Sequence, residues 1–458
     1  MKWLPAGATL LLALPSAATA ADAPPPFQLM RWEEDYAYLK DAAGPWSWDD
    51  SIKYLPLSGD GATYLSIGGE VRERYDVFSS PRFGIGPTKS DSYDLQRLLL
   101  SADLHVTSKF RVYAELSRHD EFGKRTAVLP VDQNQQNVQL LFADYVPDSA
   151  GRFTLRVGRQ ELLLNPTQRF IAAREGPNIR QSYDGARVSW REGPWAVDAF
   201  SLRPLLAKPD AFADRGDPNT LFSGLYASRK LRTPSEAVDV YWLALDRFGT
   251  RYGATLGDER RRAAGLRYAD KTASWDLELE GMWQYGTFKQ TQIRAWGGGL
   301  DAGYTWQMSW RPRLGLRLDG ASGGSLPRDG DVQTFNPLFP KGLYFDESLL
   351  TTYANLLSIR PSVTVQPIRS VSVQLSEAWR WRDDPHDALY LIPFVPVPTP
   401  PADTARYVGQ WSILDAFWRP DRYWTVQGEY VHVVAGTAVT AAHGHDVDFT
   451  MLIVQFRF

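Results

Sequence analysis

Residues 64–77 read YLSIGGEVRERYDV, and the order of apolar and polar side chains in this stretch decides the fold. Every second position is apolar, and the positions between are mostly polar or charged. One face carries Leu65, Ile67, Val71, Tyr75 and Val77, and the other carries Ser66, Glu70, Arg72, Arg74 and Asp76. Glu73 alone breaks the order. A period of two residues predicts a β-strand with one apolar and one polar face.

The same alternation continues through the rest of the chain. It is clearest in residues 98–106, 275–285, 313–319 and 371–382. A soluble β-sandwich would also alternate, with the polar face in water and the apolar face in its core. Two further features favour a transmembrane barrel.

The first feature is the length of the connections, which alternate between short and long. Short turns are predicted at 107–108, 147–151, 191–194, 271–274, 366–370 and 419–422. Longer stretches lie between them, at 78–92, 120–136, 163–182, 323–352 and 383–405. Outer-membrane barrels have this pattern, with short periplasmic turns and longer extracellular loops.

The second feature is the final stretch, residues 450–458, which reads TMLIVQFRF and alternates up to an aromatic residue. Outer-membrane barrels characteristically finish in this way. Strand starts fall near residues 62, 93, 109, 137, 153, 183, 195, 221, 237, 261, 275, 294, 313, 353, 371, 406, 423 and 447. The predicted fold is therefore all-β, a transmembrane antiparallel up-and-down β-barrel of about 18 strands over residues 62–458. Because lipid offers no partner to backbone groups, such a sheet must close on itself.

Tryptophan and tyrosine residues cluster near the predicted strand ends, as expected for aromatic girdles at the two membrane interfaces. The tryptophans concerned are Trp242, Trp275, Trp283, Trp296, Trp306, Trp310, Trp418 and Trp424. The alternative is that these aromatic residues form an ordinary core.

The first residues predict export. Lys2 precedes an apolar stretch from Leu4 to Leu14, and Ala18-Thr19-Ala20 offers a signal-peptidase site. We expect a signal peptide over residues 1–20, a periplasmic N-terminal segment over 21–61, and the outer membrane of a Gram-negative bacterium as the destination. Residues 31–36 are consistent with either a short helix or an irregular plug.

Composition excludes several classes of protein. The chain of 458 residues has no cysteine, so it contains neither a disulfide scaffold nor a cysteine-ligated metal site. It has no uncharged apolar run of about 18 residues or more, which argues against a helical membrane protein. A formal net charge of −3 argues against a protein that binds nucleic acid, because such a protein normally carries an excess of basic residues.

The polar face of the strands places many arginines in the lumen. Arginine outnumbers lysine 39 to 11 over the chain. The guanidinium fork binds carboxylates at two points and stays charged in a confined space. The residues assigned to the lumen are Arg72, Arg74, Arg97, Arg111, Arg187, Arg317, Arg360, Arg380 and Arg382, together with Glu70 and Asp103. The alternative is that pairs of arginine and acidic residues only stiffen the wall.

Several segments resemble the alginate-export porin family. They are residues 31–36 (RWEEDY), 68–75 (GGEVRERY), 96–100 (QRLLL), 157–161 (VGRQE), 174–178 (REGPN), 183–185 (YDG) and 335–341 (FNPLFPK). The resemblance implies a monomeric 18-stranded barrel with an arginine-rich lumen that passes an anionic polysaccharide. It also adds Arg159 to the substrate path, which requires a bulge at Gly158 to turn this side chain inward.

The resemblance is strongest to a branch of the family whose substrates are unassigned. Dedicated alginate exporters carry a long periplasmic loop, whereas the corresponding connection here is only residues 419–422. This difference argues against alginate itself and against periplasmic gating.

The sequence therefore predicts a passive outer-membrane porin for anionic oligosaccharides or polysaccharides, such as alginate, or for related organic anions. Its other expected partners are outer-membrane lipid, lipopolysaccharide and the barrel-assembly machinery. We expect no cofactor, no metal and no catalytic residue. The alternatives are a non-selective porin, or an enzymatic or adhesive barrel whose loops close the pore.

Two motifs bear on the enzymatic alternative. Residues 320–324 (GASGG) match the G-x-S-x-G pattern, but that pattern works on a strand-to-helix turn, and here it follows a barrel strand. His443 and His445 beside Asp446 are candidate metal ligands in an extracellular loop, although histidines in solvated loops are the commoner case.

Overall fold

The computed structural model describes residues 25–41, 47–208, 210–252, 255–324, 330–341, 344–392, 394–397 and 404–458. The expected signal peptide lies outside the described residues. Within them, no helix is long and apolar enough to cross a membrane.

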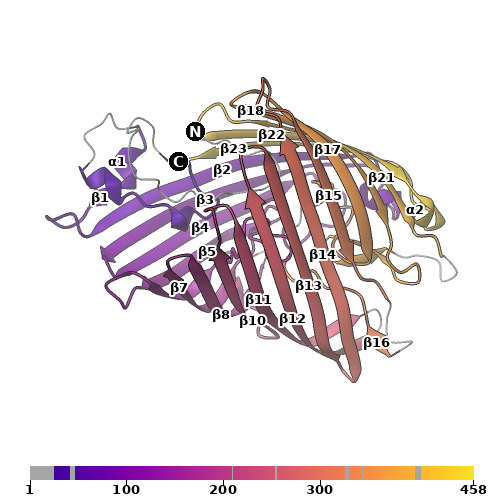
Figure 1. Cartoon of the computed structure of the whole chain (residues 1–458), viewed down its shortest axis with the longest axis horizontal. Helices are drawn as coiled ribbons and strands as arrows, with labels where there is room; N and C mark the ends of the chain where they lie inside the picture. The colour runs from indigo at the N-terminus through magenta and orange to yellow at the C-terminus, as the bar shows by residue number, and fades with distance from the viewer. Residues whose placement is uncertain are drawn as a thin grey trace.

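Eighteen strands form one closed antiparallel barrel, as the alternation predicts. In chain order they are β2 (Tyr64–Phe78), β3 (Asp91–Thr107), β4 (Phe110–Phe122), β5 (Asn134–Tyr145), β6 (Phe153–Gln160), β7 (Tyr183–Glu192), β8 (Trp195–Leu206), β10 (Thr220–Lys230), β11 (Ala237–Tyr252), β12 (Thr255–Lys271), β13 (Trp275–Phe288), β14 (Thr291–Thr305), β15 (Arg313–Ala321), β17 (Leu356–Ile368), β18 (Val371–Trp381), β21 (Tyr407–Trp418), β22 (Trp424–Ala435) and β23 (Val447–Arg457). Each pairs with its neighbour, so the barrel is an up-and-down meander (Figure 1).

The seam that closes the barrel joins β2 to β23. Its pairs run from Glu70–Arg457 to Phe78–Phe449. Beyond them, the backbone N–H groups of Gly69 and Phe458 each donate to the other residue's carbonyl, at 3.0 and 3.1 Å. The final stretch thus covers the edge of β2 that would otherwise lack a partner.

The alternation of the strands separates lipid-facing from inward-facing side chains. Val71 and Tyr75 are 39% and 50% exposed, whereas Arg72 and Arg74 are each 2% exposed. Because successive side chains of a strand point to opposite faces, the arginines face the barrel interior.

The two ends of the barrel differ, and we call them the turn side and the loop side. On the turn side, neighbouring strands are joined by the connections at 108–109, 146–152, 193–194, 231–236, 272–274, 306–312, 369–370 and 419–423. In outer-membrane barrels this side faces the periplasm. The expected strict alternation of short and long connections is wrong at two places on the loop side. There β11 and β12 are separated only by residues 253–254, and β13 and β14 only by residues 289–290, because these strands extend into hairpins.

Short elements occupy both ends. The turn side holds η1 (Arg31–Glu33), η2 (Ala37–Asp41), α1 (Asp50–Lys53) and β1 (Leu55–Pro56). The loop side holds η3 (Pro81–Gly84), β9 (Arg215–Gly216), β16 (Asp331–Val332), β19 (Leu389–Leu391), β20 (Val395–Val397) and α2 (Thr437–Ala441). In Figure 1, α1 and β1 lie at one end of the barrel and α2 and β16 at the other.

Two loop-side connections fold into the barrel. We call residues 161–182 the first lumen loop and the described residues from 330 to 355 the second lumen loop. Leu162 and Phe170 of the first and Phe335 and Tyr353 of the second belong to one buried hydrophobic cluster with inward side chains of the wall. The long connections that the sequence predicts at 163–182 and 323–352 therefore also line the interior.

The N-terminal segment enters the barrel from the turn side. Met30 and Trp32 are buried in a cluster with Tyr113, Leu140 and Phe142 of the wall. Of the two forms that the sequence leaves open for residues 31–36, the structure has an irregular segment with one short helical turn, η1.

Candidate functional site

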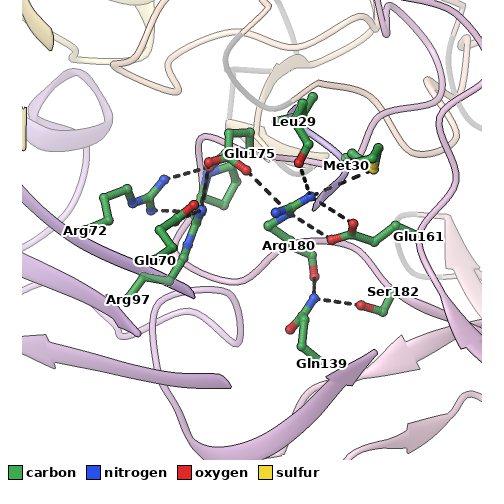
Figure 2. A network of polar contacts seen from close by, with 12 residues as sticks. Leu29, Met30, Glu70, Arg72, Arg97, Gln139, Glu161, Glu175, Arg180 and Ser182 are labelled. Carbon is green, nitrogen blue, oxygen red and sulfur yellow. Dashed lines mark hydrogen bonds and ion pairs between the residues drawn. The ribbon is translucent and has the colours of Figure 1, made fainter. Parts of the chain in front are cut away.

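The first lumen loop is held by two arginines of neighbouring strands. Arg72 of β2 pairs directly with Arg97 of β3, so both guanidinium groups reach the same stretch of the loop. Arg72 donates to the carbonyls of Glu175 and Pro177 at 2.7 and 3.1 Å. Arg97 donates to the same two carbonyls at 2.7 and 2.6 Å (Figure 2). Each of these carbonyl oxygens therefore accepts from two cations.

Carboxylates complete this cluster. Arg97 forms ion pairs with Glu70 at 3.1 Å and with Glu175 at 2.9 Å. Arg457 of β23 contacts the same two carboxylates at 3.1 and 3.2 Å. Burial alone would raise the pKa of Glu175, but Arg97 and Arg180 beside it hold the pKa below its ordinary value. The cluster thus binds the loop across the seam that closes the barrel.

Asn178 anchors the same loop to the wall and to a second connection. Its amide nitrogen lies within hydrogen-bond distance of three carbonyl oxygens, of Gln96, Asp120 and Asp132, at 3.0, 3.2 and 2.8 Å. The side chain is fully buried. Sequence reasoning did not place it in the site, although it lies in the REGPN stretch that carries the family resemblance.

Arg180 joins the first lumen loop to the N-terminal segment. It forms an ion pair with Glu161 at 2.8 Å and donates to the carbonyl of Leu29 at 3.1 Å (Figure 2). Burial raises the pKa of Glu161 to about 8, against the opposing effect of Arg180. The loop from one end of the barrel and the segment from the other meet at this residue.

The second lumen loop is held by four arginines of the wall. Arg74 contacts Glu347 at 2.6 Å, and Arg380 contacts Asp346 at 2.8 Å. Arg317 donates to the carbonyl of Tyr344 at 3.0 Å, and Arg360 donates to that of Phe345. All four arginines are among those that the alternation assigns to the lumen.

Arg169 connects the two lumen loops. It lies in the first loop, donates to the hydroxyl of Tyr344 in the second at 3.1 Å, and contacts Glu278 and Glu280 of β13 at 3.3 and 3.2 Å. It lies outside any periodic segment, so no sequence signal marks it.

A further group of inward arginines lies beside the N-terminal segment. Arg111 forms ion pairs with Asp144 at 3.1 Å and Asp103 at 3.5 Å and donates to the carbonyl of Trp32. Arg156 lies 3.8 Å from the ring centres of both Trp32 and Phe142. Sequence reasoning missed Arg156, although it alternates with the outward Leu155 and Val157.

Two more predicted residues make contacts elsewhere on the inner wall. Arg187 contacts Asp198 at 2.8 Å. Arg382 is fully buried and donates to the carbonyls of Asp387 and Ala405 at 3.1 and 2.9 Å. The predicted pair Arg380 and Arg382 therefore contacts two different connections.

The bulge expected at Gly158 is wrong, and Arg159 faces outward. Residues 155–159 of β6 pair one by one with β5, and Arg159 lies opposite Leu141, which is 49% exposed. Gly158 has φ +127°, but the strand passes it without a shift in register. Arg159 contacts Asp184 at 2.9 Å, so its charge is balanced on the outer face.

Some cations of the interior have no carboxylate partner in the part of the chain that the structure describes. Arg72, Arg174 and Lys341 make no ion pair with a carboxylate of the described residues, whereas most lumen arginines have one. Burial, followed by the charge of Arg317, lowers the pKa of Lys341 to about 8. The charge of each of these three cations is therefore not neutralised by a direct contact with a described carboxylate.

The motifs that bear on enzymatic activity have other roles. The Ser322 hydroxyl accepts from the backbone N–H of Trp296 at 2.9 Å and donates to the carbonyl of Gln333 at 2.7 Å. It lies directly after the end of β15, and the described residues between β15 and β17 contain no helix. Among the described residues, no group of three or more histidine, aspartate or glutamate side chains is placed to hold a metal ion.

Comparisons with known proteins agree on the architecture. A family model described as "Alginate export" matches residues 63–452. No curated protein matches the sequence. Three solved structures have a similar fold. OccK2 (OpdF) of Pseudomonas aeruginosa, in complex with glucuronate, is 10% identical with a TM-score of 0.58, covering 86% of this chain and 98% of its own. OccAB1 of Acinetobacter baumannii is 11% identical with a TM-score of 0.59, covering 90% and 99%. A BenF-like porin of Pseudomonas fluorescens Pf-5 is 9% identical with a TM-score of 0.58, covering 86% and 99%.

Proposed function

The chain belongs to the alginate-export family and is an outer-membrane porin of a Gram-negative bacterium, and from that premise we propose that it conducts carboxylate-bearing saccharides or related organic anions passively through an arginine-lined lumen. The proposed path comprises Arg72, Arg74, Arg97, Arg111, Arg187, Arg317, Arg360, Arg380 and Arg382, with Glu70 and Asp103 beside them. Arg159 is not part of it, because this side chain faces outward. We further propose that the protein acts as a monomer inserted by the barrel-assembly machinery.

The observation that carries the proposal is the pairing of Arg72 and Arg97 on shared backbone carbonyls. A neutral carbonyl binds a guanidinium group less strongly than a carboxylate does, because only the carboxylate carries charge and accepts at two points. A passing carboxylate can therefore replace the carbonyls of Glu175 and Pro177 at these arginines. Conduction needs binding that is weak enough to release the solute. Because the solute carboxylate only replaces carbonyls that the arginines already bind, the net binding free energy stays small.

The lumen loops set the conditions for passage. Both are attached to the wall mainly through arginines. A solute that competes for the same arginines would also loosen the loops that fill the path. In this proposal, the loops and the solute use the same binding sites in turn.

A planar-bilayer experiment tests the proposal. We compare the wild-type protein with a variant carrying Arg72→Gln and Arg97→Gln, at low salt so that screening stays weak. The wild type should prefer anions and be blocked by oligouronates, with glucuronate as a monomeric probe, since one structural neighbour was crystallised with it. The variant should lose anion preference, and its block should weaken at least about tenfold, because bonds to charged groups each contribute about 1.5–3 kcal/mol.

Arg159→Gln is the control, because it makes the same kind of substitution on the outer face and removes one positive charge next to the first lumen loop. It should leave selectivity and block unchanged. If the double variant also leaves them unchanged, the arginines are supports of the wall and the protein is a non-selective porin. If the folded wild type forms no channel at all, the alternative of a barrel closed by its loops replaces this proposal.

A further inference from the structure

The outer surface of β11–β14 carries exposed arginines just beyond an aromatic belt. Arg262 of β12 lies opposite Tyr285 of β13, and Tyr285 lies opposite Arg294 of β14. Tyr285 is 41% exposed, and the side chains of Arg262 and Arg294 are 27% and 66% exposed. All three therefore point away from the lumen. Arg260, two residues along β12, lies on the same face and is exposed.

The aromatic residues fix the level of these arginines in the membrane. Trp283 lies opposite Trp296 on the loop side, and Trp275 lies opposite Tyr304 on the turn side. Between Trp275 and Trp283, β13 exposes Leu277 and Leu279. Eight residues of strand span about 27 Å, which at a tilt of about 35–45° projects to about 19–22 Å, slightly less than an apolar band about 25 Å tall.

The arginines lie at the outer boundary of that band. The row of Arg262, Tyr285 and Arg294 is two residues beyond Trp283 and Trp296, toward the loop side. Arg260 is two residues farther. Charged groups are strongly disfavoured at the centre of lipid but tolerated at the interface, where lipid head groups supply counter-charge.

The nearby acidic residues balance only part of this charge. Asp246 forms an ion pair with Arg262 at 2.7 Å, and Asp331 forms a longer one with Arg294 at 3.6 Å. Asp258 is exposed on the same face of β12, two residues beyond Arg260. Arg260 makes no ion pair with any described residue. Elsewhere on the outer surface, β2 and β3 carry Glu73 and Asp94 at outward positions. We call the exposed surface of Arg260, Arg262 and Arg294 the basic face.

We propose that Arg260, Arg262 and Arg294 form a binding site for the phosphate groups of an outer-leaflet glycolipid, the lipid A part of lipopolysaccharide. The hydroxyl of Tyr285 lies between the arginines and accepts a hydrogen bond from the indole N–H of Trp242 at 3.0 Å, which fixes its position. Guanidinium groups bind phosphate oxygens at two points, and the leucines and tryptophans below them offer a surface to the acyl chains.

Native mass spectrometry of the folded protein in detergent tests this site. The probes are bisphosphorylated lipid A, lipid A with both phosphates removed, and phosphatidylglycerol. The wild type should retain bisphosphorylated lipid A most strongly. A variant with Arg260→Ala, Arg262→Ala and Arg294→Ala should bind it at least about tenfold more weakly, since each basic residue near an anionic surface contributes about 1 kcal/mol.

Arg118→Ala is the control, because Arg118 is 58% exposed on the outer face of β4 beside Asp120 and lies outside the basic face. It should bind lipid A like the wild type. Equal retention by the wild type of lipid A with and without phosphates would overturn the proposal without any variant. Equal retention of phosphatidylglycerol would overturn the assignment to lipid A, and an unchanged affinity of the triple variant would overturn the assignment to these arginines.

Discussion

The amide of Asn178 shows how much of the interior depends on single side chains. One nitrogen reaches carbonyls of β3, of the end of β4 and of the connection that follows. Such an amide stabilises the loop by satisfying backbone groups that are removed from water. The arginines around it hold the loop through charge, and Asn178 sets its position.

Replacing Asn178 with alanine should release the first lumen loop. The amide has two N–H groups, and hydrogen bonds of this kind contribute about 0.5–1.5 kcal/mol each, so the loop position should lose about 1–3 kcal/mol. We expect faster hydrogen exchange over residues 161–182 and a larger, noisier single-channel current. Asn219→Ala is the control, because Asn219 is an exposed asparagine on the same side of the barrel. Unchanged exchange in the Asn178 variant would show that the arginines alone hold the loop.

At the residue scale, the sequence predicts which side chains face inward but not what they bind. Strict alternation predicts that Arg74 and Arg380 face inward, and both side chains are buried. Their partners Glu347 and Asp346 lie in a loop without periodicity, so no pattern pointed to them. Arg159 was misplaced because the expected bulge at Gly158 does not form, and the strand keeps its register.

At the scale of elements, the N-terminal segment is the least predictable part. Residues 31–36 have no clear period, and their structure comes from contacts with the barrel, such as Arg31 with the carbonyls of Gly69 and Phe458. The strands are easier to predict than this segment, because one face of each strand meets lipid and the other meets the barrel interior. Sequence patterning therefore predicts the strands of the wall well, but it predicts poorly the N-terminal segment and the lumen loops inside the barrel.

Lys53 should make docking of this segment depend on pH. Burial, and then the charge of Arg31, lowers the pKa of Lys53 to about 7, from an ordinary value near 10.5. Between these two values the docked segment binds fewer protons than the free one, so docking strengthens as pH rises from 7 toward 10.5 and is weakest below 7. We expect slower exchange over residues 25–41 at pH 9 than at pH 6.5, after correction for intrinsic rates, and a smaller conductance.

The variant Lys53→Met is the control, because it keeps the length of the side chain and removes its charge. Its docking should not change over the same range. A pH dependence that persists in this variant would assign the effect to another group.

At the scale of the whole molecule, closure by β2 and β23 determines how the protein resists detergent. A closed sheet has no free edge at which to open, so unheated protein should migrate differently from boiled protein in detergent gels. Deleting Phe456–Phe458 removes the pairs of Phe458 with Gly69 and of Phe456 with Val71, and it should reduce the amount of folded protein in the outer membrane. Identical migration before and after boiling, or normal levels of the truncated protein, would contradict this account of the seam.

The position of Arg31 has a consequence for biogenesis. Its guanidinium group binds the carbonyls of Gly69 and Phe458, one from each strand of the seam. During secretion residue 31 emerges early and residue 458 late, so the side chain finds both acceptors only after the last strand has joined the first. In a half-built barrel Arg31 therefore lacks one of its two acceptors, whereas the contacts of Met30 and Trp32 with β4 and β5 do not involve the last strand. The contact of Arg31 with both strands of the seam is thus a feature of the completed barrel alone.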